Sequence, residues 1–155
     1  FNDDLLSQIY AQLGEYKEAY ALAEQLYELT DNKDYKAKMA IYKYEFSKTK
    51  NIEQIIRLFD VFFYELDNSV YYNYYGYILI DNDINIYKGL ELVLKAYELN
   101  SKSPYIIDSV AWGYYKLKRC DEAMEWIDKI TPEYLEQKEF KAHYNKIKKC
   151  IKEKR

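Results

Sequence analysis

The residues that could perform chemistry in this chain are few and far apart in the sequence. His143 is the only histidine, and Cys120 and Cys150 are the only cysteines. A cysteine beside a histidine could act as a nucleophile, because imidazole activates a thiol. Nothing in the sequence supplies an oxyanion hole or a third group to orient such a pair. We therefore favour a core or surface position for His143, keep a Cys–His enzyme as an alternative, and predict no catalytic residue.

A metal or phosphate site is not expected either. One histidine and two distant cysteines without a CxxC pair do not make a zinc site. Asp81, Asp83 and Asn85 alternate as in a calcium loop. The glycine and the closing glutamate of such a loop are replaced by Ile86 and Leu92, so we interpret the segment as an acidic turn. No glycine-rich phosphate loop is present. The sequence thus predicts neither a metal nor a cofactor.

The composition is that of a folded helical protein. Hydrophobic residues make up 49% and charged residues 32% of the 155 residues, with 4 Gly and 2 Pro. So few helix breakers favour long helices joined by tight turns. The net charge of -3, from 23 basic and 26 acidic residues, provides no basic field for nucleic acid. The basic end, residues 146–155, is interpreted as a solvated helix face.

Helical periodicity predicts nine helices. Leu58, Phe62 and Leu66 share one helix face. Ser103-Pro104 and Thr131-Pro132 each place a hydroxyl N-cap before a proline at the first helical position. Short connections make neighbouring helices antiparallel. The predicted ranges are 2–13, 16–29, 34–49, 52–66, 69–80, 87–99, 104–117, 121–130 and 133–152.

The helix pairs repeat along the chain. Overlaying LGEYKEAYALAEQLYEL (13–29) on the later pairs places Ala19, Ile55, Gly89 and Ala123 in one slot, at intervals of 36, 34 and 34 residues. A helix–turn–helix period of about 34 residues is the signature of a tetratricopeptide repeat. Small residues suit this slot because the two helices of a pair cross closely there.

The chain resembles the tetratricopeptide repeat family over nearly its whole length. GEYKEAYALAEQLYEL keeps the family's Gly, Tyr and Ala, and SPYIIDSVAWGYYKLKRCDEAMEWIDK is close to a complete repeat. Ala111, Lys118 and Cys120 stand where Gly, Gly and Tyr are usual, and DYKAKMAIYKYEFSKTK matches poorly. YNYYGYILIDNDINIYKGLELVLKAYELN resembles the longer-turned repeats of bacterial members.

The resemblance implies an all-α solenoid of antiparallel helix pairs, a right-handed superhelix closed by a C-terminal capping helix. We expect a single domain, 1–155, with repeats at about 1–32, 33–67, 68–102 and 103–132 and the cap at 133–152. Stacking is required because one helix pair cannot bury its own apolar face.

The resemblance also implies a binding face. In this family the first helices of successive repeats line a concave groove, and Tyr77 and Trp112 would be neighbours on its wall. Packing of Trp112 between helices is the alternative. Asp4 and Asp108 replace the lysines of the family's carboxylate clamp, so capture of an acidic C-terminus is not expected. The groove residues carried over are Gln8, Tyr44, Asn73, Tyr77, Ile80, Asp108, Trp112 and Tyr115.

The expected function is protein–protein interaction rather than catalysis, with a peptide or helix of a partner held in the groove as part of a larger assembly. A structural spacer, or self-association through the N-terminal end of the array, is the alternative. No apolar stretch of about 18 residues exists, so we expect no membrane insertion. Because the chain begins with Phe1, we expect it to be a piece of a longer bacterial protein. Its compartment stays open between the cytoplasm and the periplasm or cell envelope.

Overall fold

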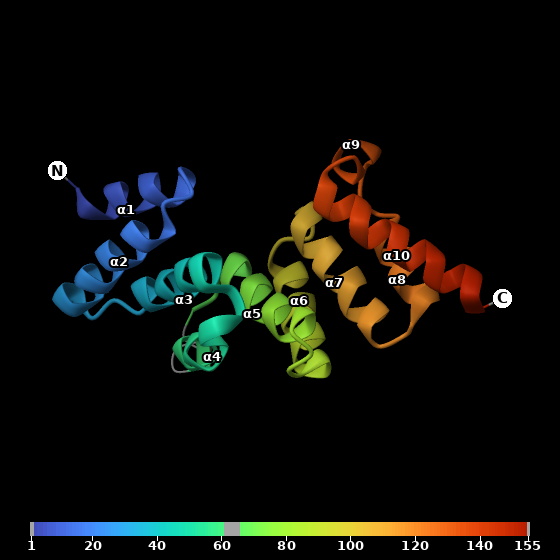
Figure 1. The fold of residues 1–155 in the computed structure, drawn as a ribbon, viewed down its shortest axis with the longest axis horizontal. Coiled ribbons are helices and arrows are strands. Elements are labelled where there is room, and N and C mark those ends of the chain that lie inside the picture. The colour runs from blue at the N-terminus through green and yellow to red at the C-terminus, as the bar shows by residue number, and fades with distance from the viewer. Residues whose placement is uncertain (1, 61–65, 155) are drawn as a thin grey trace. The chain divides into compact units, whose positions relative to one another are not determined.

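The computed structural model describes residues 2–60 and 66–154, and every regular element within those ranges is a helix (Figure 1). The chain divides into two compact units, Phe1–Asp67 (unit 1) and Asn68–Arg155 (unit 2). The division into four repeats of one domain stays a prediction. Over the described ranges, no helix combines the length and the apolar character that crossing a bilayer requires.

Unit 1 consists of consecutive helices that each pack on the next. Its α-helices are close to the predicted ones, but residues 48–51 form a 3₁₀ turn between the third and fourth helices. The helix predicted for 52–66 runs into residues 61–65, which lie outside the described residues. The elements are α1 (Asp3–Gln12), α2 (Tyr16–Thr30), α3 (Asp34–Ser47), η1 (Lys48–Asn51) and α4 (Ile52–Asp60).

Small residues allow close packing in unit 1, as predicted for the repeat slot. Ala19 and Ala23 of α2 are fully buried. The Ser7 hydroxyl of α1 donates to the Ala19 carbonyl at 2.9 Å, so the two helices approach closely there. Gly14, in the turn between them, has φ +78°, a left-handed backbone conformation that glycine adopts without strain.

The described part of unit 2 contains six helices, and its first pair makes the most extensive contact of any consecutive pair of helices in the described ranges. A Cβ added to Gly76 would lie 2.7 Å from the Gly89 carbonyl oxygen, and one added to Gly89 would lie 2.6 Å from the Gly76 carbonyl oxygen. The packing role predicted for Gly89 is confirmed, and Gly76 is its partner across the helix pair. The elements are α5 (Ser69–Asp81), α6 (Ile86–Leu99), α7 (Pro104–Lys116), α8 (Cys120–Ile127), α9 (Pro132–Leu135) and α10 (Lys138–Lys154).

The C-terminal part of unit 2 corrects two sequence predictions. The helix predicted for 133–152 is a short α9 followed by the longer α10, and Thr131 makes no side-chain cap hydrogen bond. Asp121 lies in the first turn of α8, and its carboxylate accepts from the Lys154 ammonium at 2.9 Å. Ser103 does cap α7, accepting from the Ile106 N–H at 3.4 Å.

Helix α10 closes the apolar end of the last helix pair, as expected of a cap. Phe140 and Ile147 of α10 are buried in one core cluster with residues of α7 and α8. The same cluster contains Ala123, the predicted small residue of the last pair. Full burial of a Phe or Ile side chain contributes about 1.5–3 kcal/mol to folding stability. The remaining buried members are Ile107, Ala111, Ile127 and Ile130.

Candidate functional site

The candidate site lies in unit 2, where side chains of α5, α7 and α10 meet. Asn73 and Tyr77 lie four residues apart on α5, so they share one helix face. Trp112 and Tyr115 lie on α7, and their rings stack with centroids 4.6 Å apart. Three of the predicted residues, Tyr77, Asp108 and Trp112, all contact side chains of α10.

Trp112 is buried, with only 4% of its surface exposed. The His143 ring of α10 stacks on it with a centroid distance of 4.1 Å. Its indole N–H donates to an Asp81 carboxylate oxygen at 3.1 Å, which satisfies the one polar group of the ring. The ammonium groups of Lys116 and Lys146 lie 5.6 and 5.4 Å from the indole, within cation–π range. A partner therefore cannot contact much of Trp112 unless these side chains move.

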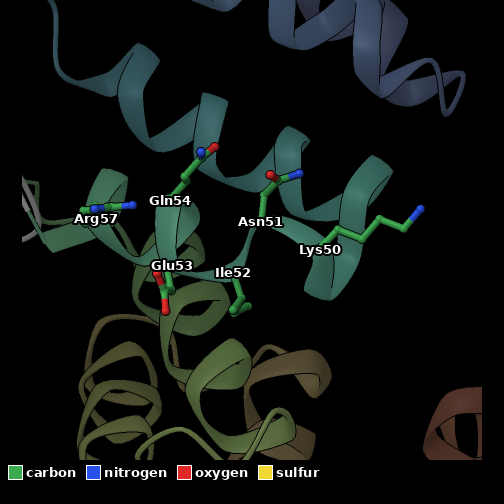
Figure 2. A pocket seen from close by; sticks show the side chains of 6 residues that line it. All are labelled: Lys50, Asn51, Ile52, Glu53, Gln54 and Arg57. Atoms are coloured by element: carbon green, nitrogen blue, oxygen red, sulfur yellow. The ribbon is translucent and has the colours of Figure 1, made fainter.

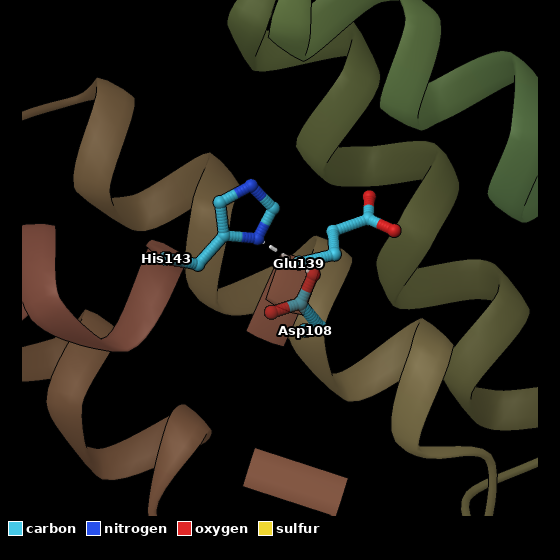
Figure 3. A group of neighbouring side chains, drawn as sticks. All are labelled: Asp108, Glu139 and His143. Carbon is cyan, nitrogen blue, oxygen red and sulfur yellow. Dashed lines mark hydrogen bonds and ion pairs between the residues drawn. The ribbon is translucent and has the colours of Figure 1, made fainter. Parts of the chain in front are cut away.

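Asp108 and His143 form a buried pair across α7 and α10. The His143 Nδ1 and an Asp108 carboxylate oxygen are 2.8 Å apart (Figure 3). Burial raises the pKa of the Asp108 carboxyl, while the hydrogen bond and the charge of His143 act in the opposite direction. The second Asp108 oxygen, Oδ1, is also buried and has no hydrogen-bond partner.

Glu139 completes this group from one turn earlier on α10. Its side chain is exposed, and one of its carboxylate oxygens accepts from the Tyr77 hydroxyl at 3.5 Å. One ligand atom from each of Asp108, Glu139 and His143 lies within 4.8 Å of the others. His143 therefore lies in the core, one of the two positions favoured for it. The sequence pattern does not indicate the Asp108 carboxylate beside it, because that residue lies 35 positions away on another helix.

The other predicted residues differ in accessibility. Ile80 is fully buried in the core between α5, α6 and α7, so it lines no accessible surface here. Asn73 is half-buried, and its side-chain oxygen is buried without a hydrogen-bond partner. In unit 1, Gln8 is exposed on α1, and Tyr44 is buried on α3 with the Lys48 ammonium 5.2 Å from its ring.

The two cysteines are joined in a disulfide. Cys120 begins α8 and Cys150 lies near the end of α10, with their Cα atoms 5.9 Å apart. This single bridge ties the capping helix α10 to the last helix pair. A nucleophilic cysteine must be a free thiolate. The Cys–His alternative therefore lacks its nucleophile while the bridge is intact.

A pocket in unit 1 is lined by side chains that do not converge on one point. It encloses about 290 Å³ beside η1 and the start of α4. Its side chains point in different directions rather than toward one centre (Figure 2). None of the predicted site residues lines it. The lining residues are Lys50, Asn51, Ile52, Glu53, Gln54 and Arg57.

Known proteins with similar sequences or structures are helical-repeat proteins. No family model matches the chain. A TPR repeat-containing protein of Pseudomonas aeruginosa is 33% identical over 70 residues, which is 45% of this chain and 12% of that protein. The solved structure of MamA AMB-1 has a TM-score of 0.70 at 17% identity, over 97% of this chain and 96% of the other. MamA MSR-1 has a TM-score of 0.66 at 18% identity, over 96% and 94%.

The packed helix pairs and these likenesses define an all-α helical-repeat protein. Within that class, the chain has the tetratricopeptide-repeat fold. Proteins of this kind are in general scaffolds for protein interaction and not enzymes.

Proposed function

We propose that unit 2 binds a helix or extended peptide of a partner protein on the surface formed by α5, α7 and α10. The observation that carries this proposal is the aromatic cluster of Tyr77, Trp112, Tyr115 and His143, gathered on these three helices. Aromatic side chains offer large contact areas with few rotatable bonds, so they often anchor interfaces. Trp112 is buried and supports the cluster from the interior, while the half-buried Tyr77 and Tyr115 contact the partner.

Asn73 adds a polar requirement to this surface. Its buried side-chain oxygen has no hydrogen-bond partner, although such groups are usually paired. It lies one helical turn before Tyr77. Rotation of the Asn73 side chain toward the surface would let this oxygen accept from a peptide N–H laid along α5, which would fix the register of the peptide. Asp108, in place of a clamp lysine, disfavours an acidic C-terminus as the ligand.

The test uses a photo-crosslinking amino acid at position 115 to capture the partner, followed by affinity measurements with the purified partner. Tyr115→Ala is expected to weaken binding by about 2 kcal/mol, or roughly 30-fold, as loss of an interface anchor does. Tyr87→Ala is the matched control, because Tyr87 is 75% exposed on α6, outside the surface. Equal affinities for the Tyr115 variant and the wild type, with unchanged helical content, would refute the proposal.

Self-association is a second candidate, favoured by an apolar stripe on α1. Leu5, Ile9 and Leu13 are spaced four residues apart on one face and are exposed by 50%, 36% and 71%. A second copy of the chain would cover this stripe. Sedimentation velocity should then show a dimer that Leu5→Lys/Leu13→Lys abolishes and that Leu29→Lys, on α2, leaves intact. A wild-type chain that remains monomeric as its concentration is raised would exclude this candidate.

A further inference from the structure

We propose that Asp108, Glu139 and His143 bind a divalent transition-metal ion of the zinc class, which fastens α10 to α7 (Figure 3). Asp108 lies on α7, and Glu139 and His143 lie 31 and 35 positions later in the sequence, on α10. One possible ligand atom from each lies within 4.8 Å of the other two. The ion would therefore join the cap to the last helix pair at a second point, apart from the disulfide.

The burial of Asp108 is the strongest support for a ligand. Only 3% of the residue is exposed, yet Oδ1 has no hydrogen-bond partner. A buried carboxylate is costly unless its oxygens meet donors or a cation. His143 contacts only the other oxygen, Oδ2. A bound cation would compensate the charge of this carboxylate, and coordination through both of its oxygens would give Oδ1 the partner that it lacks.

The spacing needs only small side-chain movements. Zinc–ligand distances of about 2.0–2.2 Å place tetrahedral ligand atoms roughly 3.3–3.6 Å apart. His143 Nδ1 and Asp108 Oδ2, now 2.8 Å apart, would separate by about half an ångström. Figure 3 shows the Glu139 carboxylate directed away from the His143–Asp108 contact. Because Glu139 is exposed, rotation of its side chain can bring the carboxylate toward the ion.

The donor set selects the class of ion. An imidazole nitrogen with two carboxylate oxygens suits zinc, cobalt and related ions. Magnesium and calcium prefer oxygen ligands alone. Two carboxylates balance the charge of a divalent ion, and three protein ligands leave a fourth position for water. The cysteines take no part because they are bonded to one another.

The test is a titration of the tag-free, metal-free chain with Zn²⁺ by calorimetry, without reductant so that the disulfide stays closed. Co²⁺ is the spectroscopic probe, since its visible absorption reports nitrogen and oxygen coordination. We expect one ion per chain and a raised melting temperature. Mg²⁺ and Ca²⁺ are expected to bind far more weakly than Zn²⁺.

The decisive variant is Glu139→Gln, because Glu139 is exposed and its replacement does not disturb the core. Loss of this ligand should weaken Zn²⁺ binding by at least about 10- to 100-fold, the cost of losing even an outer-shell partner. Glu153→Gln makes the same charge change at an exposed site on the same helix and should bind Zn²⁺ as the wild type does. His143→Gln and Asp108→Asn should abolish the Co²⁺ absorption.

Three results would overturn the proposal. The first is the absence of stoichiometric Zn²⁺ binding by the folded wild-type chain. The second is equal affinity of the Glu139→Gln and Glu153→Gln variants. The third is equal affinity of the wild type for Ca²⁺ and Zn²⁺, which would exclude an ion of the zinc class.

Discussion

The two units of the chain differ in how their helix pairs are completed. Unit 2 ends with α10, which is packed into the core by Phe140 and Ile147 and tied to α8 by the disulfide. Unit 1 begins with α1, whose stripe of Leu5, Ile9 and Leu13 is exposed. In a repeat array each pair is stabilised mainly by its neighbours. The comparison therefore indicates that local stability depends more on whether a further helix covers the terminal pair than on the pair itself.

The helix termini show a weaker contrast among the described residues. In unit 2, the side chains of Asn68, Asn85 and Ser103 cap α5, α6 and α7, while α8 and α9 begin without a side-chain cap hydrogen bond. In unit 1, Asn2 caps α1, while α2 and α3 begin without such a bond. Each such cap contributes about 1 kcal/mol. Unit 2 is therefore expected to be the more stable of the two.

Opening the disulfide should have the largest effect on this difference. The bridge closes a loop of 30 residues, so Cys120→Ala/Cys150→Ala should lower the stability of unit 2 by about 3–4 kcal/mol, mainly through the entropy of the unfolded chain. Hydrogen exchange measured by mass spectrometry should show faster exchange in α8 and α10. Exchange in α2 and α3 should not change.

A reductant provides the control for this prediction. It should reproduce the effect in the wild type and have no further effect on the double variant. Equal acceleration of exchange in unit 1 and unit 2 would contradict the view that each unit responds separately.

The fold was predictable where packing is local and periodic. The interval of 34 to 36 residues between equivalent positions predicted the helix pairs, and three of the four residues there, Ala19, Gly89 and Ala123, are small, as the close crossing of paired helices requires. Features that join distant residues were missed. The Cys120–Cys150 bridge depends on how α10 lies on α8, and pairing of cysteines is not determined by their positions in the sequence.

The candidate site was only partly predictable, for a geometric reason. A helix turns by about 100° per residue, so an error of one position moves a side chain from a surface to the core. Ile80 is such a case, because it is fully buried. Trp112 is buried as well, because His143 and Tyr115 cover it, which agrees with the alternative that it packs between helices. Nothing in the local pattern of α7 indicates that cover, since His143 lies 31 residues away.

Replacing one glycine in each unit tests the same comparison, with a smaller expected loss of stability than removal of the disulfide. In Gly76→Ala the new Cβ would lie 2.7 Å from the Gly89 carbonyl oxygen, which belongs to the backbone and moves only if α5 and α6 separate. Overpacking costs about 1–3 kcal/mol, and alanine returns up to about 1 kcal/mol of helix propensity. A net loss of about 2 kcal/mol in unit 2 is expected from urea unfolding, with faster exchange in α5 and α6.

Gly14→Ala is the counterpart in unit 1, where the reason for glycine is different. No atom lies within 4 Å of the added Cβ, so overpacking does not occur. The cost comes from the left-handed backbone at φ +78°, about 1–2 kcal/mol for an L-residue, and is offset in part by the lower entropy of the unfolded chain. A net loss of about 1 kcal/mol, with faster exchange confined to α1 and α2, is expected. If Gly14→Ala proved the more destabilising of the two, close helix packing would not be what distinguishes unit 2.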